Sequence, residues 1–118
     1  MSPINKKIVS SYIQNIWVDR DFSMIKKYIA KDYVAYGMRN KITVNGILGV
    51  EQNIKKLLEK YPDFVVIVED MIDNGNKVVS RLIFKPSEDS DISMREIILH
   101  EIKDDKIHRA WSIGSDWN

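Results

Sequence analysis

The segment that most constrains the fold is 64–84, where two runs rich in valine and isoleucine flank the dipeptide Asn74-Gly75. β-branched residues favour strands, and Asn-Gly supplies the two positive φ angles that a type I′ turn requires. The segment therefore predicts an antiparallel hairpin with strands over 64–73 and 77–84.

The register of this hairpin follows from its turn. With Asn74 and Gly75 as the two loop residues, Val68 lies opposite Arg81 and Glu69 lies opposite Ser80. One face then carries Val65, Ile67, Met71, Val78 and Leu82, and the other carries Val66, Val68, Ile72, Val79 and Ile83. An antiparallel sheet with one solvated face is normally polar on that face. We therefore expect a homodimer, in which a second copy of the chain covers the open face of the sheet.

The first half of the chain has helical periodicity. A helix opened by Ser2 and Pro3 is expected to continue to Trp17, and a shorter one is expected over 22–29. After a brief strand over 33–38 and a loop over 39–45, a third helix should begin between residues 46 and 50 and end by Tyr61, because a proline follows it.

The C-terminal part predicts a second hairpin over 94–103 and 106–117, turning at Asp104-Asp105. Three helices followed by an antiparallel meander predict an α+β fold class, a cone-shaped curved antiparallel sheet packed against three N-terminal helices. The 118 residues, 1–118, fit one domain.

Charge and composition exclude several functional classes. The formal net charge is only +1, which gives no strong basic field to attract nucleic acid. The chain has no cysteine, which excludes thiolate catalysis and cysteine-ligated zinc and suits a reducing compartment. Neither a signal core nor a membrane-spanning stretch is present in the sequence. We expect a cytoplasmic protein without nucleic-acid or membrane partners.

The second hairpin predicts a candidate site. If its turn holds two residues, His100 lies opposite Arg109, and the side chains of Glu96, His100, Arg109 and Trp111 share one face. On the catalytic interpretation His100 carries the proton and Glu96 or Asp116 tunes or replaces it. Arg109 then holds an enolate or carboxylate oxygen, and Trp111 packs against a ring of the ligand. The alternative is a structural cross-strand cluster whose members satisfy one another by hydrogen bonds.

Aromatic residues could also orient a ligand. Tyr12, Trp17, Tyr33 and Tyr36 are expected around the interior of the cone, either as ligand contacts or as ordinary core. His108 is expected opposite Glu101 in a solvated cross-strand pair. No metal-ligand spacing is found.

The basic residues Lys55, Lys56 and Lys60 are expected on the solvated side of the third helix.

The order of several short pieces carries a family resemblance. They are Asn15 to Asp21, Asp32 to Val34, Gly49 to Lys60, Tyr61 to Phe64, Val68 to Asp70, Asn74 to Val79, Arg81, Lys106-Ile107, Trp111 and Asp116. Together they resemble the SnoaL-like polyketide cyclase family, within the nuclear transport factor two-like and ketosteroid isomerase-like superfamily. The chain departs from the family pattern in the loop Lys85 to Asp91, which has neither the histidine nor the glycines, and at Ser115, where the final acid usually stands.

The resemblance implies an apolar pocket inside the cone and an aspartate acting as general acid/base in an aldol closure, without metal or organic cofactor. We therefore expect a small, largely apolar carbonyl ligand, and aldol cyclisation, isomerisation or hydration as the chemistry. A non-catalytic ligand-binding or dimerisation module of the same fold is the alternative. The aspartate is expected to be Asp116, brought to the pocket by a bulge at Gly114 that changes its strand parity, where burial would raise its pKa.

Overall fold

The computed structural model describes residues 3–37 and 40–114, and residues 1–2, 38–39 and 115–118 lie outside this description. The helices are α1 (Pro3–Tyr12), which continues as a π-helical segment (Ile13–Val18), a 3₁₀ turn (Phe22–Met24), α2 (Ile25–Tyr28) and α3 (Gly46–Lys60). The strands are β1 (Ile29–Tyr36), β2 (Ile42–Asn45), β3 (Val65–Asn74), β4 (Lys77–Lys85), β5 (Met94–Lys103) and β6 (Lys106–Gly114).

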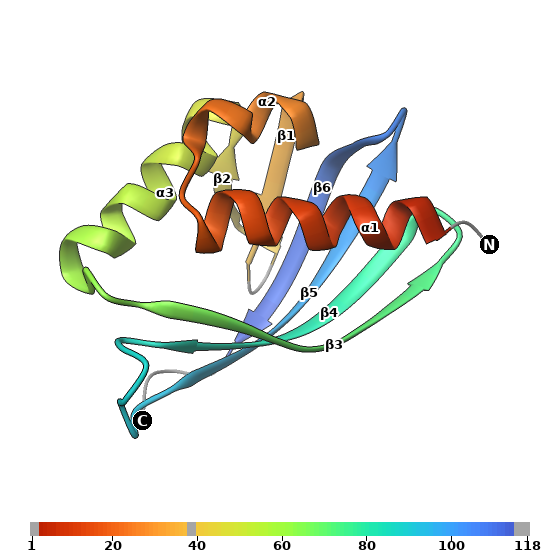
Figure 1. The fold of residues 1–118 in the computed structure, drawn as a ribbon. Helices are drawn as coiled ribbons and strands as arrows, with labels where there is room; N and C mark the ends of the chain where they lie inside the picture. The colour runs from red at the N-terminus through yellow and green to blue at the C-terminus, as the bar shows by residue number, and fades with distance from the viewer. Residues whose placement is uncertain (1–2, 38–39, 115–118) are drawn as a thin grey trace.

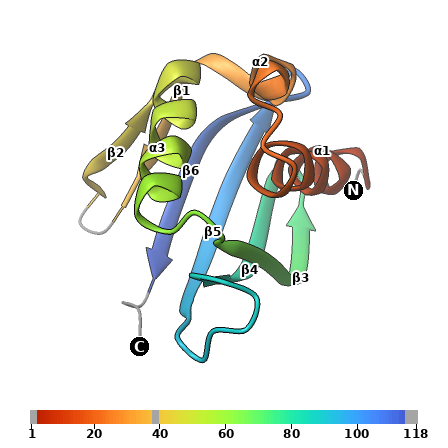
Figure 2. The same ribbon diagram turned by 60° about the vertical axis from the view of Figure 1, so that its left-hand side comes forward.

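The six strands form one curved sheet in the order β2-β1-β6-β5-β4-β3. Neighbours are antiparallel except β1 and β6, which are parallel. Helix α1 crosses the sheet and contacts β3 and β4, while α3 packs on β1 and β2 on the same side (Figures 1 and 2). This confirms the expected α+β architecture. We call the helix-covered side of the sheet the inner face and the opposite side the outer face.

The helices and β5 lie close to their predicted positions, whereas the segment before α3 was only partly predicted. The first strand begins at Ile29, inside the range expected for the second helix, and the expected loop over 39–45 contains β2. Strand β2 has four residues and pairs with β1 through a register shift. A strand this short has no clear alternating pattern, and its pairing with β1 is a tertiary contact.

The first hairpin has its turn one residue later than predicted. Asn74 pairs with Lys77, so Gly75 and Asn76 are the loop residues, and only Gly75 has a positive φ, of 64°. This is the pattern of a type II′ turn rather than type I′. A further register shift at Glu69 places Val68 opposite Leu82 rather than Arg81.

These two shifts correct the predicted faces of the first hairpin. Ile67 lies opposite Ile83 and shares the outer face with it, whereas Val66 lies opposite Phe84 on the inner face. Strand β4 alternates as expected, with Val78, Ser80, Leu82 and Phe84 buried on the inner face.

The second hairpin turns where predicted but then changes register. Asp104 and Asp105 have φ angles of 52° and 61°, as a type I′ turn requires. Ile102 pairs with Ile107, but Glu101 pairs with Arg109, so His108 is an extra residue in β6. From there the ladder is regular as far as the pair Glu96 and Gly114, so the described part of β6 has no bulge at Gly114.

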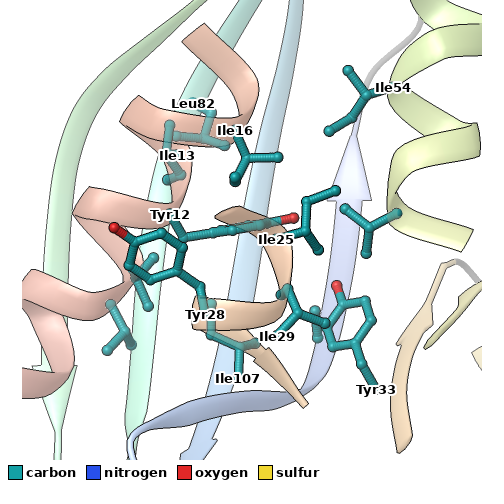
Figure 3. Packing of buried hydrophobic residues seen from close by; sticks show 14 of the residues in the cluster. Tyr12, Ile13, Ile16, Ile25, Tyr28, Ile29, Tyr33, Ile54, Leu82 and Ile107 are labelled. Atoms are coloured by element: carbon teal, nitrogen blue, oxygen red, sulfur yellow. The ribbon is translucent and has the colours of Figure 1, made fainter. Parts of the chain in front are cut away.

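The core lies between the helices and the inner face. Helical side chains such as Ile16 and Ile54 pack there against sheet residues such as Ile29, Leu82 and Ile107 (Figure 3). Three tyrosines, Tyr12, Tyr28 and Tyr33, are buried in the same cluster. The interior of this domain therefore contains several hydroxyl groups as well as apolar side chains.

Candidate functional site

A cavity of about 480 Å³ lies between the helices and the inner face of the sheet. This is within the range of small-molecule sites in proteins. Its wall is mainly apolar, and β4 and β5 contribute Leu82, Phe84, Met94 and Ile98. The polar groups of the wall include Tyr12 on α1, Tyr33 on β1, the residues Asn53, Lys56 and Lys60 on α3, and the pair Glu96 and His100 on β5.

Glu96 places a carboxyl group in this wall. Its strand partners are Leu82 on β4 and Gly114 on β6. Burial among apolar neighbours disfavours the charged form and raises the pKa of Glu96 to about 7. Near neutral pH the carboxyl group can therefore both accept and donate a proton, which is the property that a general acid/base needs.

Tyr33 and Tyr12 remain protonated in the same cavity. Burial, with the charges of Tyr12 and Glu96 as smaller causes, raises the pKa of Tyr33 well above 10. Burial raises the pKa of Tyr12 to about 12, although the Trp17 indole donates a hydrogen bond of 3.1 Å to its hydroxyl oxygen. Both hydroxyl groups are therefore hydrogen-bond donors at neutral pH.

His100 lies deeper, with its ring edge-on to Tyr12 at a centroid distance of 6.1 Å. Burial lowers the pKa of His100 to about 4, so the ring is neutral at pH 7. Its Nδ1 atom and the Ser80 hydroxyl are buried without a hydrogen-bond partner among the described residues. A neutral imidazole orients a ligand by hydrogen bonding better than it delivers a proton.

Two of the predicted site residues on β6 lie on the outer face. The Arg109 Nη1 atom donates hydrogen bonds to the carbonyl oxygens of Asp32, at 2.7 Å, and His108, at 2.8 Å. Trp111 stacks on Tyr36 with ring centroids 5.6 Å apart and an angle of 17°. The prediction that Glu96, His100, Arg109 and Trp111 share one face is therefore wrong.

The physical cause is the extra residue in β6. Side chains alternate along a strand, so one inserted residue at His108 moves every later side chain to the other face. His100 lies opposite Ala110 rather than Arg109, and Ala110 and Ser112 line the cavity instead. Tyr36, the parallel partner of Trp111, faces outward with it, so the expectation that Tyr36 lines the cavity is also wrong.

The structure brings five of the predicted residues into the cavity wall: Tyr12, Trp17, Tyr33, Glu96 and His100. Asp116 lies outside the described residues. His108 does not face Glu101; its Nδ1 atom lies 3.1 Å from the Asp32 carboxylate.

Lys55, Lys56 and Lys60 are exposed, as expected, and Lys56 and Lys60 also line the cavity, which was not predicted. The spacing of Lys56 and Lys60 from Asn53 and Leu57 places all four residues on one side of the helix, and this spacing could have indicated their position in the cavity wall.

Within residues 3–37 and 40–114 no group of three or more histidine, aspartate or glutamate side chains is placed to hold a metal ion. No helix of the described chain is long and apolar enough to cross a membrane.

Comparison with known proteins places this geometry in a family. The model of the family described as SnoaL-like polyketide cyclase matches residues 7–116. No curated protein matches the chain.

Solved structures share the fold at low sequence identity. A SnoaL-like polyketide cyclase from Agrobacterium tumefaciens superposes with a TM-score of 0.77 at 16% identity, covering 95% of this chain and 91% of that one. A cystatin-fold protein from Novosphingobium aromaticivorans gives 0.79 at 17% identity, covering 96% and 98%. A candidate ketosteroid isomerase from Kribbella flavida gives 0.78 at 10% identity, covering 98% and 80%. At such identities the likeness establishes the fold alone.

Proposed function

The chain belongs to the SnoaL-like polyketide cyclase family, and we propose that it performs cofactor-free acid/base chemistry on a small, largely apolar carbonyl compound bound in its cavity. The observation that carries the proposal is the carboxyl group of Glu96, which lines an apolar cavity with a pKa of about 7. A carboxyl group with this pKa can take a proton from a carbon next to a carbonyl group and return it within one reaction.

The surrounding groups suit such a reaction. Glu96 takes the proton from the α-carbon, and the electron pair of the broken C–H bond moves onto the carbonyl oxygen to give an enolate. The Tyr33 hydroxyl is the donor proposed for the enolate oxygen, because it stays protonated and interacts electrostatically with Glu96. In an isomerisation the protonated Glu96 then returns the proton to another carbon. In an aldol cyclisation the enolate carbon first bonds to a second carbonyl carbon of the same ligand, the π electrons of that carbonyl move onto its oxygen, and Glu96 protonates the resulting alkoxide.

Neutral His100 is assigned a positioning role. It lies beyond Ile98 on the same face of β5, with its ring against Tyr12, and its Nδ1 atom has no partner among the described residues. The ring can therefore hydrogen-bond to a polar group at the deep end of the ligand.

Deuterium exchange into a surrogate ketone tests the proposal. 2-Tetralone is a small apolar ketone, and the loss of its α-proton signals in D₂O is followed by NMR. The protein should accelerate exchange above the buffer rate. The enzymatic rate should rise with pH up to about 7 and level off above it, because ionised Glu96 is the base. A ketone that binds but exchanges only at the buffer rate would favour the non-catalytic ligand-binding module.

We also propose that a second copy of the chain covers the outer face. A row of apolar cross-strand partners supports this: Ile72, Val79, Leu99, Trp111 and Tyr36 follow one another across five strands. Ile72, Ile97 and Ile113 are more than half exposed on this face. Ion pairs between Arg81 and Asp70 and between Arg95 and Glu69 lie beside this apolar surface. An apolar centre with a polar surround is the usual composition of a protein interface.

A further inference from the structure

We propose that the ligand of the cavity carries an anionic group, which Lys56 and Lys60 of α3 hold at the rim while the apolar body fills the cavity. The inference rests on the proposed function only in assuming that the cavity binds a ligand. It adds the chemical class of that ligand, an amphipathic anion such as an aryl or alkyl carboxylate or sulfonate.

The two lysines lie on the side of α3 that lines the cavity. Asn53, Lys56, Leu57 and Lys60 all line the cavity, and their spacing of three and four residues places them on one side of α3. Both lysines are exposed to solvent as well, so their charged ends lie where the cavity opens. A long side chain can pack its methylene groups on an apolar wall while its ammonium group stays at the rim.

These two positive charges are not neutralised by an ion pair with any residue that the structure describes. Lys55, on the same helix, forms an ion pair of 2.7 Å with Glu51. In the described part of the chain, no carboxylate lies within ion-pairing distance of Lys56 or Lys60. Lys60 instead has its ammonium group over the Tyr61 ring, 5.4 Å from the centroid. Like charges four residues apart on a helix repel each other, and a bound anion would relieve this repulsion.

The lysines are not a cause of the shifted pKa of Glu96. Burial alone raises the pKa of Glu96, with no opposing contribution from a neighbouring cation. A lysine close to this carboxyl group would lower its pKa. We therefore assign proton transfer to Glu96 and charge recognition to the two lysines of α3.

The rest of the cavity wall contrasts with the two lysines, because it is mainly apolar and contains side chains such as Val66, Phe84 and Met94. A purely apolar ligand would make no use of the two cations. A ligand with an apolar body and one anionic end would satisfy both parts of the site.

Two fluorescent probes that differ only in one anionic group test this inference. They are 8-anilinonaphthalene-1-sulfonate and its uncharged analogue N-phenyl-1-naphthylamine, and displacement by 2-tetralone shows that each probe occupies the cavity. Lys56→Gln/Lys60→Gln should weaken the sulfonate about fivefold, the effect of losing two exposed ion pairs. The uncharged probe should bind the variant and the wild type equally. Added salt should weaken only the sulfonate, and only in the wild type.

The matched control is Lys55→Gln, which removes a lysine from the same helix that is paired with Glu51 and does not line the cavity. It should leave both affinities unchanged. The inference is overturned if the double variant binds the sulfonate as well as the wild type does, or if it weakens both probes equally. Failure of the proposed function looks different, because then 2-tetralone still displaces both probes from the wild-type protein but its α-protons exchange only at the buffer rate.

Discussion

The two faces of the sheet are built from the same strands, yet they differ in what they contain. The inner face holds half-buried Glu96 and buried His100 in the wall of a cavity between the sheet and the helices. The outer face holds an apolar row in which Trp111 stacks on Tyr36, and no element of the described chain covers it. Polar groups on the inner face cost folding free energy that apolar side chains would not cost. Apolar groups on the outer face are exposed to water, where polar side chains would be usual.

This contrast separates two roles for one sheet. Unpaired ionisable groups in an apolar wall lower stability, and they are a common feature of catalytic or binding sites. Exposed apolar groups in a continuous row are a common feature of interfaces. We therefore assign ligand chemistry to the inner face and self-association to the outer face, and the following predictions test that division.

The largest effect is expected for Glu96→Gln on the inner face. The amide cannot take a proton from carbon, so 2-tetralone exchange should fall by roughly 10²–10⁴-fold, to near the buffer rate. The matched control is Glu101→Gln, which removes a carboxyl group from the same strand that forms an ion pair with Lys77 and does not line the cavity. Exchange by Glu101→Gln should equal that of the wild type. Equal losses in both variants would contradict the assignment of Glu96.

On the outer face, Ile97→Lys should weaken the dimer by about 100-fold, since pairing would then bury an uncompensated charge. Ile97 is 52% exposed, so the substitution should be tolerated by the monomer. Sedimentation velocity at micromolar concentration measures the change. The control is Leu48→Lys, at an exposed leucine of α3 that lies off the sheet, and it should remain dimeric. A wild-type protein that sediments only as a monomer contradicts the self-association of this face.

The pH dependence of stability should show the two buried groups acting in opposite directions. Glu96 has a folded pKa of about 7 against an ordinary value of 4.5, so the folded state binds its proton more tightly and stability falls as pH rises between these values. His100 has a folded pKa of about 4 against 6.5, so its contribution is complete above 6.5 and is lost as pH falls toward 4. Each effect amounts to about 3 kcal/mol at most.

Between about pH 4.5 and 6.5 these two slopes should largely cancel in the wild type. Glu96→Gln removes the falling slope, so the free energy of unfolding of this variant should rise with pH over the same range. Urea denaturation at several pH values measures it. Parallel curves for wild type and variant would show that the Glu96 carboxyl group is not perturbed by burial.

The smallest effect is expected from Trp111, which was predicted on the inner face but lies on the outer face. Trp111→Phe alters the outer face and should leave the affinity for N-phenyl-1-naphthylamine unchanged within about twofold, whereas Trp17→Phe removes contact area in the cavity and should weaken it by roughly 10-fold. Fluorescence titration of both variants gives the comparison. Equal weakening by the two substitutions would contradict the separation of the faces.

Much of the fold could be predicted from the sequence, because hydrophobic period and turn residues act locally. Helix α3 and strands β3 to β6 follow from the spacing of apolar residues and from breakers such as Pro62. Strand β2 could not be predicted, because four residues contain too little pattern and their pairing with β1 is a tertiary contact.

Only part of the candidate site could be predicted from the sequence. Glu96 and His100 lie on one strand without an irregularity between them, so their shared face follows from alternation alone. The prediction that Arg109 and Trp111 share that face depended on the register between β5 and β6. The extra residue His108 shifts this register, so both side chains lie on the opposite face. The bulge lies beside contacts made by a distant segment, because Asp32 pairs with His108 and its carbonyl oxygen accepts a hydrogen bond from Arg109.

The sequence by itself therefore determined helix α3, strands β3 to β6 and the alternation of side chains along uninterrupted stretches such as Glu96 to His100. Only the tertiary structure decided which face of β6 meets the cavity and that Lys56 and Lys60 stand at its rim. The physical reason is that strand side chains have a period of two, so the one residue inserted at His108, shortly after the turn, exchanges the faces of the rest of β6. The position of this insertion depends on contacts between segments remote in sequence.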